Sequence, residues 1–377
     1  MNILILCDKF LPISEQFIYN QIRCLDNHNL FLFARKTINR ELYDSHFKKE
    51  LIWYNNPAHR LLYKIMKEKE QYPNHIQKLL QNFIKVNNID IIYIHYGTTA
   101  TAYQNTINKI AIPVICAFHG FDASRKLNDP IYRDAIHTLE KSIFHFTAPS
   151  DYLVDKLNKA GVPANKITKI QYGTDIEKID QVLPENDNLN RKITIIHAGR
   201  IVAKKGVPDL VKVFLKLAKN HADLHLKIVG GGEEETVVRQ IINSSILGQK
   251  VEMTGPLNHL ELIKAVKSAD IFVLNSRETE SGETEGLPNS IMEAMTCNTC
   301  IVSTKHSGIP ELLTNNVNGI LIDPKNNDQL EEALNTLIQD KDLRLRLQTE
   351  ARKTVENYFS LNHMNKLINE LVTSVDI

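Results

Sequence analysis

Two glutamates eight positions apart, Glu285 and Glu293, are the residues whose type and spacing most directly suggest chemistry. They lie in the segment TEGLPNSIMEA, where Pro288 predicts the start of a helix because proline is favoured at a first helical position. Glu293 would then lie on the helix and Glu285 on the loop before it, so the two carboxylates could reach opposite ends of one ligand. Carboxylates bind sugar hydroxyls well, although two glutamates at this spacing are commonplace by themselves.

The same helix start offers a binding site for an anion. At Asn289 and Ser290 the backbone N–H groups would lack partners within the helix and would point outward. Such groups, together with the helix dipole, favour a negatively charged ligand, and a diphosphate would suit them.

A second segment, HAGRIVAKKGVPDLV at residues 197–211, supplies the cations that such a ligand needs. A strand is expected to end at Gly199, and a loop then leads into a helix, so Arg200 and Lys205 could both reach the anion. Arginine offers a planar fork for phosphate oxygens and lysine a compact charge. Lys204 is an adjacent alternative, and a surface loop with ordinary cations is the alternative interpretation.

The first half of the chain contributes further candidates. The segment CAFHGFDAS places His119 at the end of a buried strand, where open α/β sheets present ligand-facing groups. Its imidazole could hydrogen-bond a sugar hydroxyl, although a lone histidine is more often structural. Ser14 and Glu15 indicate a helix start near the N-terminus, at which Ser14 would act as a cap.

The segment around the two glutamates resembles a family signature. The run from Glu285 to Glu293 is similar to the Glu-x7-Glu motif of the family 4 retaining glycosyltransferases, which have the GT-B fold of two Rossmann-like domains. The resemblance implies that Glu285 contacts the donor sugar and that Glu293 holds the nucleotide ribose.

Other segments resemble further elements of that family. The run from Gly199 to Gly206 is similar to its Gly-Arg-x4-Lys-Gly element, a register that selects Lys205. The family's His-Gly-x-Asp element is also matched, which implies that His119 faces the transferred sugar and that Asp122 supports its loop.

Two loops resemble turns that family members place beside the donor and its base. One is the glycine run after the strand expected to end at Val229, and the other is the loop from Val251 to Pro256. The donor-binding residues implied by these resemblances are Gly199, Gly231, Gly232, Val251, Pro288, Asn289, Ser290 and Glu293.

The loop after the first expected strand resembles a subgroup of the family. FLPISEQFI is similar to the Pro-x-x-Ser-Glu-x-Phe-Ile version found in enzymes that build bacterial exopolysaccharide, capsule and lipopolysaccharide, with a spacing one residue shorter. The paired glycines that many family members carry in this loop are missing from it. The resemblance implies acceptor contacts by Ser14 and Glu15, with Asp122 on the same side.

Short apolar runs alternate with helix-length amphipathic segments, the pattern of parallel sheets covered by helices. With 377 residues, the chain is long enough for two α/β domains. We expect an α/β protein of GT-B architecture, in which two Rossmann-like domains with parallel sheets face each other across a cleft. The expected parts are an acceptor-side domain over 1–180, a linker over 181–191, a nucleotide-sugar-binding domain over 192–358 and a C-terminal helix over 359–377, which could pack back on the first domain.

The apolar runs predict six strands in each half of the chain. Those of the first half are 2–7, 30–34, 89–95, 113–118, 143–148 and 166–171, and those of the second are 193–198, 225–229, 250–254, 271–274, 300–303 and 319–322. Amphipathic spacing predicts two helices over 57–86, interrupted near Pro73, and three at 328–339, 341–358 and 361–375.

The charge pattern limits the class of partner. A net charge of +1 argues against a nucleic-acid binder, because neutralising many phosphates needs an excess of lysine and arginine. Residues 1–180 hold 23 Lys and Arg against 18 Asp and Glu, and the remainder holds 22 against 26. A basic N-terminal domain could contact a membrane surface or an anionic acceptor, or the difference could be ordinary scatter of solvated charges.

Five cysteines in apolar surroundings indicate free thiols in a reducing compartment. No apolar run has the length of a spanning helix or a signal segment, so we expect a cytoplasmic protein that could lie peripherally on the inner face of the cell membrane. Cys297 and Cys300 have CxxC spacing without a second metal-binding pair, and Asp340 and Asp342 lie between two expected helices. We therefore expect no metal and no cofactor.

Together the motifs and the family resemblance predict a metal-independent transferase, and the resemblance implies that it retains the configuration of the transferred sugar. It would move a hexose-type sugar from a nucleotide diphosphate donor, UDP being favoured, to a glycan or lipid-linked glycan. The expected catalytic residues are His119, Arg200, Lys205 and Glu285. The alternatives are a nucleotide-sugar epimerase of the same fold and a non-catalytic two-domain ligand-binding protein.

Overall fold

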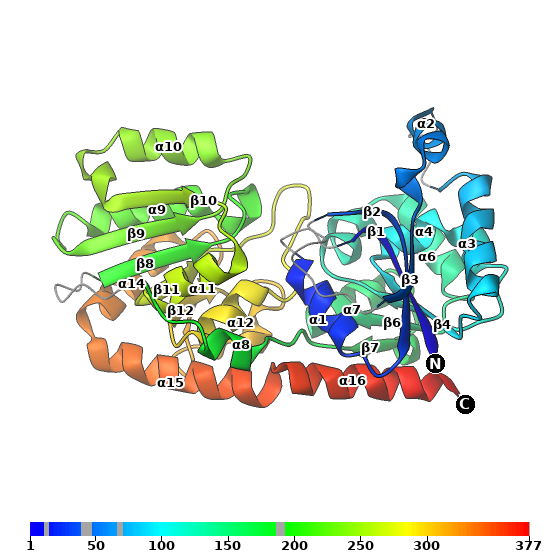
Figure 1. Cartoon of the computed structure of the whole chain (residues 1–377). Coiled ribbons are helices and arrows are strands. Elements are labelled where there is room, and N and C mark those ends of the chain that lie inside the picture. The colour runs from blue at the N-terminus through cyan, green and yellow to red at the C-terminus, as the bar shows by residue number, and fades with distance from the viewer. Residues whose placement is uncertain (11–14, 39–46, 66–70, 186–192, 377) are drawn as a thin grey trace. The chain divides into compact units, whose positions relative to one another are not determined.

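The computed structural model describes residues 1–10, 15–38, 47–65, 71–185 and 193–376. It divides into two compact units, which we call unit 1 (Met1–Gly173 and Leu361–Ile377) and unit 2 (Thr174–Ser360). Figure 1 shows that each unit has its own sheet with helices packed around it. The short helix α8 (Ile176–Asp180) falls in unit 2, whereas the sequence suggested a boundary after residue 180.

Unit 1 is built on a parallel sheet of seven strands in the order β3-β2-β1-β4-β5-β6-β7. The apolar runs correctly predicted six of them. The strands are β1 (Asn2–Phe10), β2 (Asn29–Thr37), β3 (Phe47–Ile52), β4 (Ile91–His95), β5 (Val114–Ala117), β6 (His145–Ala148) and β7 (Ile167–Lys169).

The strand that the sequence did not predict is β3, at the edge of this sheet. Its sequence, FKKELI, carries three charged residues and no continuous apolar run. Charged side chains are common on edge strands because they discourage pairing with other chains. A search for apolar runs therefore misses a strand of this kind.

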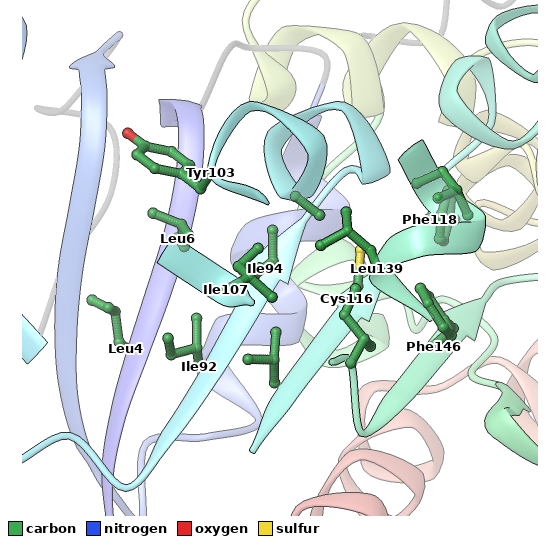
Figure 2. Packing of buried hydrophobic residues seen from close by; sticks show 14 of the residues in the cluster. Leu4, Leu6, Ile92, Ile94, Tyr103, Ile107, Cys116, Phe118, Leu139 and Phe146 are labelled. Atoms are coloured by element: carbon green, nitrogen blue, oxygen red, sulfur yellow. The ribbon is translucent and has the colours of Figure 1, made fainter. Parts of the chain in front are cut away.

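Alternate side chains of the unit 1 strands form a core on one face of the sheet, shown from close by in Figure 2. Successive residues of a strand point to opposite faces, which is why every second residue belongs to this core. Helices α5 (Gln104–Ile107) and α6 (Pro130–Leu139) contribute to it. The labelled members are Leu4, Leu6, Ile92, Ile94, Tyr103, Ile107, Cys116, Phe118, Leu139 and Phe146.

The intervening strand residues form a second core, which α1 (Gln16–Arg23) and the last helix, α16 (Leu361–Thr373), cover. Ile368 of α16 is fully buried in this core. The C-terminal helix is therefore part of unit 1. The remaining helices of unit 1 are α2 (Pro57–Ile65) and α3 (Asn74–Val86), which confirm the predicted break near Pro73, with α4 (Gly97–Ala102) and α7 (Asp151–Lys159).

Unit 2 contains a parallel sheet of six strands in the order β10-β9-β8-β11-β12-β13. All six had been predicted from the sequence. They are β8 (Ile193–Ala198), β9 (Leu224–Val229), β10 (Val251–Gly255), β11 (Ile271–Leu274), β12 (Cys300–Thr304) and β13 (Ile320–Ile322).

Helices cover the unit 2 sheet. One core joins strand residues to α9 (Val207–Leu217), α10 (Glu235–Asn243) and α14 (Asn327–Gln339). Helices α11 (His259–Lys267), α12 (Asn289–Thr296) and α15 (Lys341–Tyr358) also contact the strands or one another, and α13 (Ile309–Leu312) follows β12. Helix α12 begins one residue later than the position expected for Pro288. Pro288 is its N-cap, in an extended conformation.

Each sheet reverses its strand order at one point, between β1 and β4 in unit 1 and between β8 and β11 in unit 2. Loops that leave neighbouring strands at such a point diverge, so open α/β sheets bind ligands outside the carboxyl ends there. The fold is therefore the expected pair of parallel-sheet, Rossmann-like domains. Within the described residues, no helix combines the length and apolar character needed to cross a membrane.

Candidate active site

Loops from four strands of unit 2 meet at the carboxyl end of the sheet. These loops follow β8, β9, β11 and β12, and backbone hydrogen bonds hold them together. The bonds run from Ile201 N to Gly231 O at 3.0 Å, from Arg277 N to Lys204 O at 2.8 Å and from Gly308 N to Gly286 O at 3.2 Å. Residues far apart in sequence are thereby brought to the switch point between β8 and β11.

The centre of this group is an ion pair between two residues predicted from the sequence. Lys205 Nζ, from the β8 loop, lies 3.0 Å from Glu285 Oε1, from the β11 loop, and both residues are less than a tenth exposed. A lysine ammonium has three N–H donors, and each oxygen of a carboxylate can accept more than one hydrogen bond. Both groups therefore keep hydrogen-bonding capacity that a ligand could use.

A parallel ion pair lies beside the first. Lys204 Nζ is 2.9 Å from Glu283 Oε1, and it also donates to the Thr284 carbonyl oxygen at 3.3 Å. The two neighbouring lysines thus pair separately with two glutamates of the polar run before α12. Lys205, rather than the alternative Lys204, is the partner of Glu285.

The charges of the central pair depend on each other. Burial alone raises the pKa of Glu285, but Lys205 and Lys204 outweigh this effect and lower the pKa to about 2. Burial lowers the pKa of Lys205 below its ordinary value, and Glu285 opposes that shift. At neutral pH the carboxylate is ionised, and it stabilises the buried ammonium.

A histidine that the sequence reasoning did not single out lies next to Lys205. Fully buried His197 contacts the Val273 carbonyl oxygen through Nδ1 at 3.1 Å. A carbonyl oxygen only accepts, so Nδ1 carries the proton and Nε2 offers a lone pair. Burial, followed by the charge of Lys205, lowers the pKa of His197 to about 4, so the ring is neutral at pH 7.

Gly199 leaves space beside these two side chains. A Cβ at Gly199 would lie 3.6 Å from His197 Nε2 and 3.7 Å from Lys205 Cε. His197 Nε2 has no hydrogen-bond partner among the described residues. The Nε2 acceptor of His197 and the side chain of Lys205 therefore border the space that Gly199 leaves.

The second predicted cation and the predicted anion site lie at the same edge of the sheet. Arg200 is exposed, directly after Gly199, and its charge contributes to the lowered pKa of Lys205. Asn289 and Ser290 begin α12 three and four residues beyond the loop's Gly286, and no side chain caps this helix end. These groups suit an anion.

The glycines after β9 allow the loops to pack closely. Gly230 has φ of +131°, and a Cβ there would lie 2.0 Å from the Gly199 carbonyl oxygen. A Cβ at Gly232 would lie 2.4 Å from the Ile201 carbonyl oxygen, whereas one at Gly231 would meet nothing closer than 3.4 Å. Glycine is thus required at the first and third positions for backbone packing.

The β12 loop supports Glu285 from another direction. The hydroxyl of Ser307 donates to the Glu285 carbonyl oxygen. Neighbouring His306 is buried, and its Nε2 has no partner among the described residues. Burial lowers the pKa of His306, which makes it a neutral group next to the ion pair.

Glu293, on α12, also has a partner that sequence reasoning missed. His259 Nε2 lies 3.0 Å from Glu293 Oε1. Val251, by contrast, is not brought to this edge. It begins β10 and packs against the core, while Gly255, at the other end of that strand, accepts a hydrogen bond from Gly230 N at 2.9 Å.

In unit 1, His119 follows β5 as predicted, but both of its ring nitrogens have protein partners. Nε2 lies 3.1 Å from His95 Nδ1, and Nδ1 lies 2.8 Å from the Tyr172 hydroxyl. Burial, with His95 next, lowers the pKa of His119 well below its ordinary value. The neutral ring is therefore held in place before any ligand arrives.

Asp122 supports the His119 loop directly. Its carboxylate accepts hydrogen bonds from the backbone N–H groups of Gly97 at 2.9 Å, His119 at 3.0 Å and Gly120 at 3.1 Å. The residue is fully buried, so it does not present its carboxylate to solvent in this structure.

Glu15 precedes α1, and Ser14 lies outside the described residues. The Tyr96 hydroxyl donates to Glu15 Oε1 at 2.9 Å, and Oε2 is buried without a partner among the described residues. Burial raises the pKa of Glu15 to about 7 despite that hydrogen bond. Tyr96 itself has φ of +75°, an uncommon conformation for a bulky residue.

The two signals discounted in the sequence are structural features. Cys297 and Cys300 are buried free thiols, and Asp340 caps α15 by accepting from Leu343 N at 2.8 Å. In the described part of the chain, no group of three His, Cys, Asp or Glu side chains is arranged to hold a metal ion.

Two protein-family models match the chain, and together they cover most of both units. Residues 15–178 match the model described as Glycosyltransferase Family 4. Residues 176–354 match the model described as Glycosyl transferases group 1.

Curated relatives include enzymes of bacterial polysaccharide synthesis. The chain is 30% identical over 242 residues to the amylovoran biosynthesis glycosyltransferase AmsK of Erwinia amylovora, an alignment that covers 62% of this chain and 57% of that protein. It is 27% identical over 289 residues to the putative colanic acid biosynthesis glycosyltransferase WcaL of Escherichia coli K12, covering 76% of this chain and 71% of that protein.

Among solved structures, the fold is similar to that of Anabaena Alr3699/HepE in complex with UDP. The TM-score is 0.81 at 18% identity, and the match covers 99% of this chain and 100% of that one. A complex of the same protein with UDP-glucose gives a TM-score of 0.77, also at 18% identity, with 99% and 100% coverage. This similarity establishes the shared fold.

Proposed function

Because the chain belongs to the glycosyltransferases that combine a Family 4 domain with a group 1 domain, we propose that it uses a nucleotide diphosphate sugar, with UDP favoured. The sugar is of the hexose type and passes with retention to a glycan or lipid-linked glycan of a bacterial surface polysaccharide. The observation that carries the proposal is the buried Lys205–Glu285 pair beside Arg200 at the switch point of unit 2. The relatives in amylovoran and colanic acid synthesis support the acceptor class.

The proposed site assigns a role to each group. Lys205 and Arg200 neutralise the diphosphate, with the backbone N–H groups of Asn289 and Ser290, at the start of α12, around it. Glu285 orients sugar hydroxyls, and Glu293 binds the ribose. The pairing of Lys205 with Glu285 supports this assignment, since it fixes both groups before the donor arrives.

The proposed reaction is a substitution on one face of the sugar. The bond from the anomeric carbon to the leaving phosphate oxygen breaks, and a bond from that carbon to the acceptor oxygen forms on the same face. The acceptor's hydroxyl proton passes to the departing diphosphate. Charge grows on the diphosphate during this step, so preorganised cations contribute more to the transition state than to the ground state.

Unit 1 is proposed to bind the acceptor, through Glu15 and the residues around His119. No metal or organic cofactor is required in this scheme, because side-chain cations and backbone N–H groups serve the diphosphate. Peripheral contact of unit 1 with a membrane surface belongs to the same proposal, and its support is the excess of basic residues in the first half of the chain.

The test is product analysis by proton NMR. UDP-glucose, UDP-galactose and GDP-mannose are each incubated with the protein and a lipid-linked sugar, with EDTA present. The proposal expects release of the nucleoside diphosphate. It also expects the anomeric proton signal of the product to show the same anomeric configuration as the donor sugar. An inverted product contradicts retention, a requirement for added metal contradicts metal independence, and isomerised donor without transfer indicates the epimerase.

A further inference from the structure

The carboxylate proposed to bind ribose is held by a residue to which no role has been given. His259 Nε2 lies 3.0 Å from Glu293 Oε1. We propose that His259 is a positioning residue, which fixes the Glu293 carboxylate so that its second oxygen, Oε2, receives a ribose hydroxyl. The inference rests on the proposed function and adds a residue to it.

Both side chains come from helix positions that the backbone defines. His259 is the first residue of α11, and the preceding Asn258 caps that helix by accepting from Glu261 N at 3.0 Å. Glu293 lies in the middle of α12, and α11 and α12 contact each other. The interaction therefore joins two regular elements rather than two loops.

The remaining oxygen is available for a ligand. A carboxylate has two oxygens that can accept several hydrogen bonds, and only Oε1 of Glu293 has a partner among the described residues. The Glu293 side chain is 16% exposed, so its negative charge is only partly hydrated. A carboxylate fixed in advance loses less conformational entropy when ligand hydroxyls bind to it.

The charge of His259 is coupled to this contact. Burial lowers the pKa of His259, but the hydrogen bond and the charge of Glu293 outweigh it, so that the pKa lies above the ordinary value of 6.5. The charges of Lys178 and Asp175, near the start of α8, act on the pKa of His259 in opposite directions, Lys178 lowering it and Asp175 raising it. Nε2 can donate in the neutral and in the protonated ring, so the positioning persists through neutral pH.

The experiment compares nucleotides that differ in one ribose hydroxyl. Binding of UDP, 2′-deoxy-UDP and 3′-deoxy-UDP is measured by calorimetry, with the corresponding GDP series run in parallel. A hydrogen bond to a charged group discriminates by about tenfold or more, so the wild type should favour the ribonucleotide by that factor over at least one deoxy analogue. Glu293→Ala should remove this preference.

The variants of His259 separate positioning from a structural role. His259→Ala should reduce the preference for the ribonucleotide to within about threefold of the preference that Glu293→Ala shows. The variant that combines both substitutions should lose no more of this preference than Glu293→Ala alone. His259→Gln should retain most of the preference, because its amide nitrogen can donate from a similar place. Leu260→Ala, which truncates an exposed side chain on the same helix, should match the wild type.

Each contrary outcome has a distinct meaning. A wild-type ribose preference in His259→Ala overturns the positioning role alone. A wild type that binds UDP or GDP without distinguishing any deoxy analogue overturns the ribose assignment of Glu293, and the positioning role with it. A wild type that binds no nucleotide of either series overturns the proposed function as well.

Discussion

At the scale of single residues, the site depends on a buried ion pair whose charges stabilise each other. Lys205 and Glu285 are both almost completely buried, and each offsets the burial cost of the other. Removing one partner leaves an unpaired buried charge, which is far more costly than removing both. Because single and double substitutions differ in this way, their effect on stability can be measured separately from their effect on catalysis.

We predict that Lys205→Met and Glu285→Gln each lower the free energy of unfolding by about 3 kcal/mol. Each should also reduce transfer at least about 100-fold, because a group that acts on the transition state is lost. The double variant should regain most of the stability but none of the activity, as urea unfolding and initial-rate measurements would show. Lys216→Ala, which removes one partner of an ion pair with Glu331 at the surface, is the matched control. A double variant that keeps transfer activity would refute the assigned roles.

Glu15 gives a pH-dependent prediction. Burial raises its pKa from 4.5 to about 7, so the folded state binds this proton more tightly than the unfolded state does. The resulting stabilisation is complete below pH 4.5 and is lost as the pH rises through 7. Between pH 5 and pH 8 the free energy of unfolding of the wild type, measured by urea unfolding, should fall by about 2 kcal/mol more than that of Glu15→Gln. Equal losses in both proteins would show that Glu15 does not titrate in this range.

Sequence signatures predicted some residues of the site but not their partners. Lys205 and Glu285 could be identified because their motifs have a fixed local spacing. The contact of His259 with Glu293 spans 34 positions and depends on the packing of α11 on α12. For His119, the strand end was predictable, but the occupation of both ring nitrogens by His95 and Tyr172 was not.

At the scale of elements, the site is built where loops leave parallel strands. Apolar runs predicted the central strands because they are buried on both faces. The same criterion missed edge strand β3, whose three charges interrupt any run. Val251 was assigned to the donor site through the resemblance of the loop from Val251 to Pro256 to a family turn, but it is the first residue of β10 and therefore lies at the end of that strand away from the carboxyl edge of the sheet.

Close packing of two loops predicts different tolerances at neighbouring glycines. Gly230→Ala should lower the free energy of unfolding by about 3 kcal/mol, because its Cβ would overlap the Gly199 carbonyl oxygen and its φ is positive. Gly231→Ala should change it by less than about 1 kcal/mol. Urea unfolding of the two variants provides the comparison. Equal stabilities would mean that the β8 and β9 loops are not packed as described.

At the scale of the whole molecule, the chain forms two units and returns to the first at its end. Residues 361–377 are distant in sequence from residues 1–173, yet α16 shares a core with β1 and β2. The amphipathic spacing of the last segment predicted a helix. It did not determine which sheet that helix covers, because any exposed apolar face could receive it.

We predict that Ile368→Ala destabilises unit 1 without affecting nucleotide binding by unit 2. Ile368 is fully buried, and truncation of such a residue costs about 2–5 kcal/mol. Thermal unfolding and calorimetry with UDP would measure the two effects. Lys366→Ala, on the exposed side of the same helix, should leave both the stability and the affinity for UDP unchanged. A loss of UDP affinity in Ile368→Ala, at a temperature where this variant is folded, would contradict the prediction.

The measurement that tests the central claim most directly is the affinity of UDP, GDP and ADP for the wild type and for Arg200→Ala. Arg200 is exposed, so its substitution should leave the fold intact while removing a cation proposed to bind the diphosphate. We predict that at least one nucleoside diphosphate binds the wild type and that Arg200→Ala binds it about tenfold more weakly, with the affinity for the free nucleoside unchanged. Failure of all three nucleotides to bind, or equal affinity in the variant, would contradict the claim that this edge of unit 2 binds a nucleotide diphosphate.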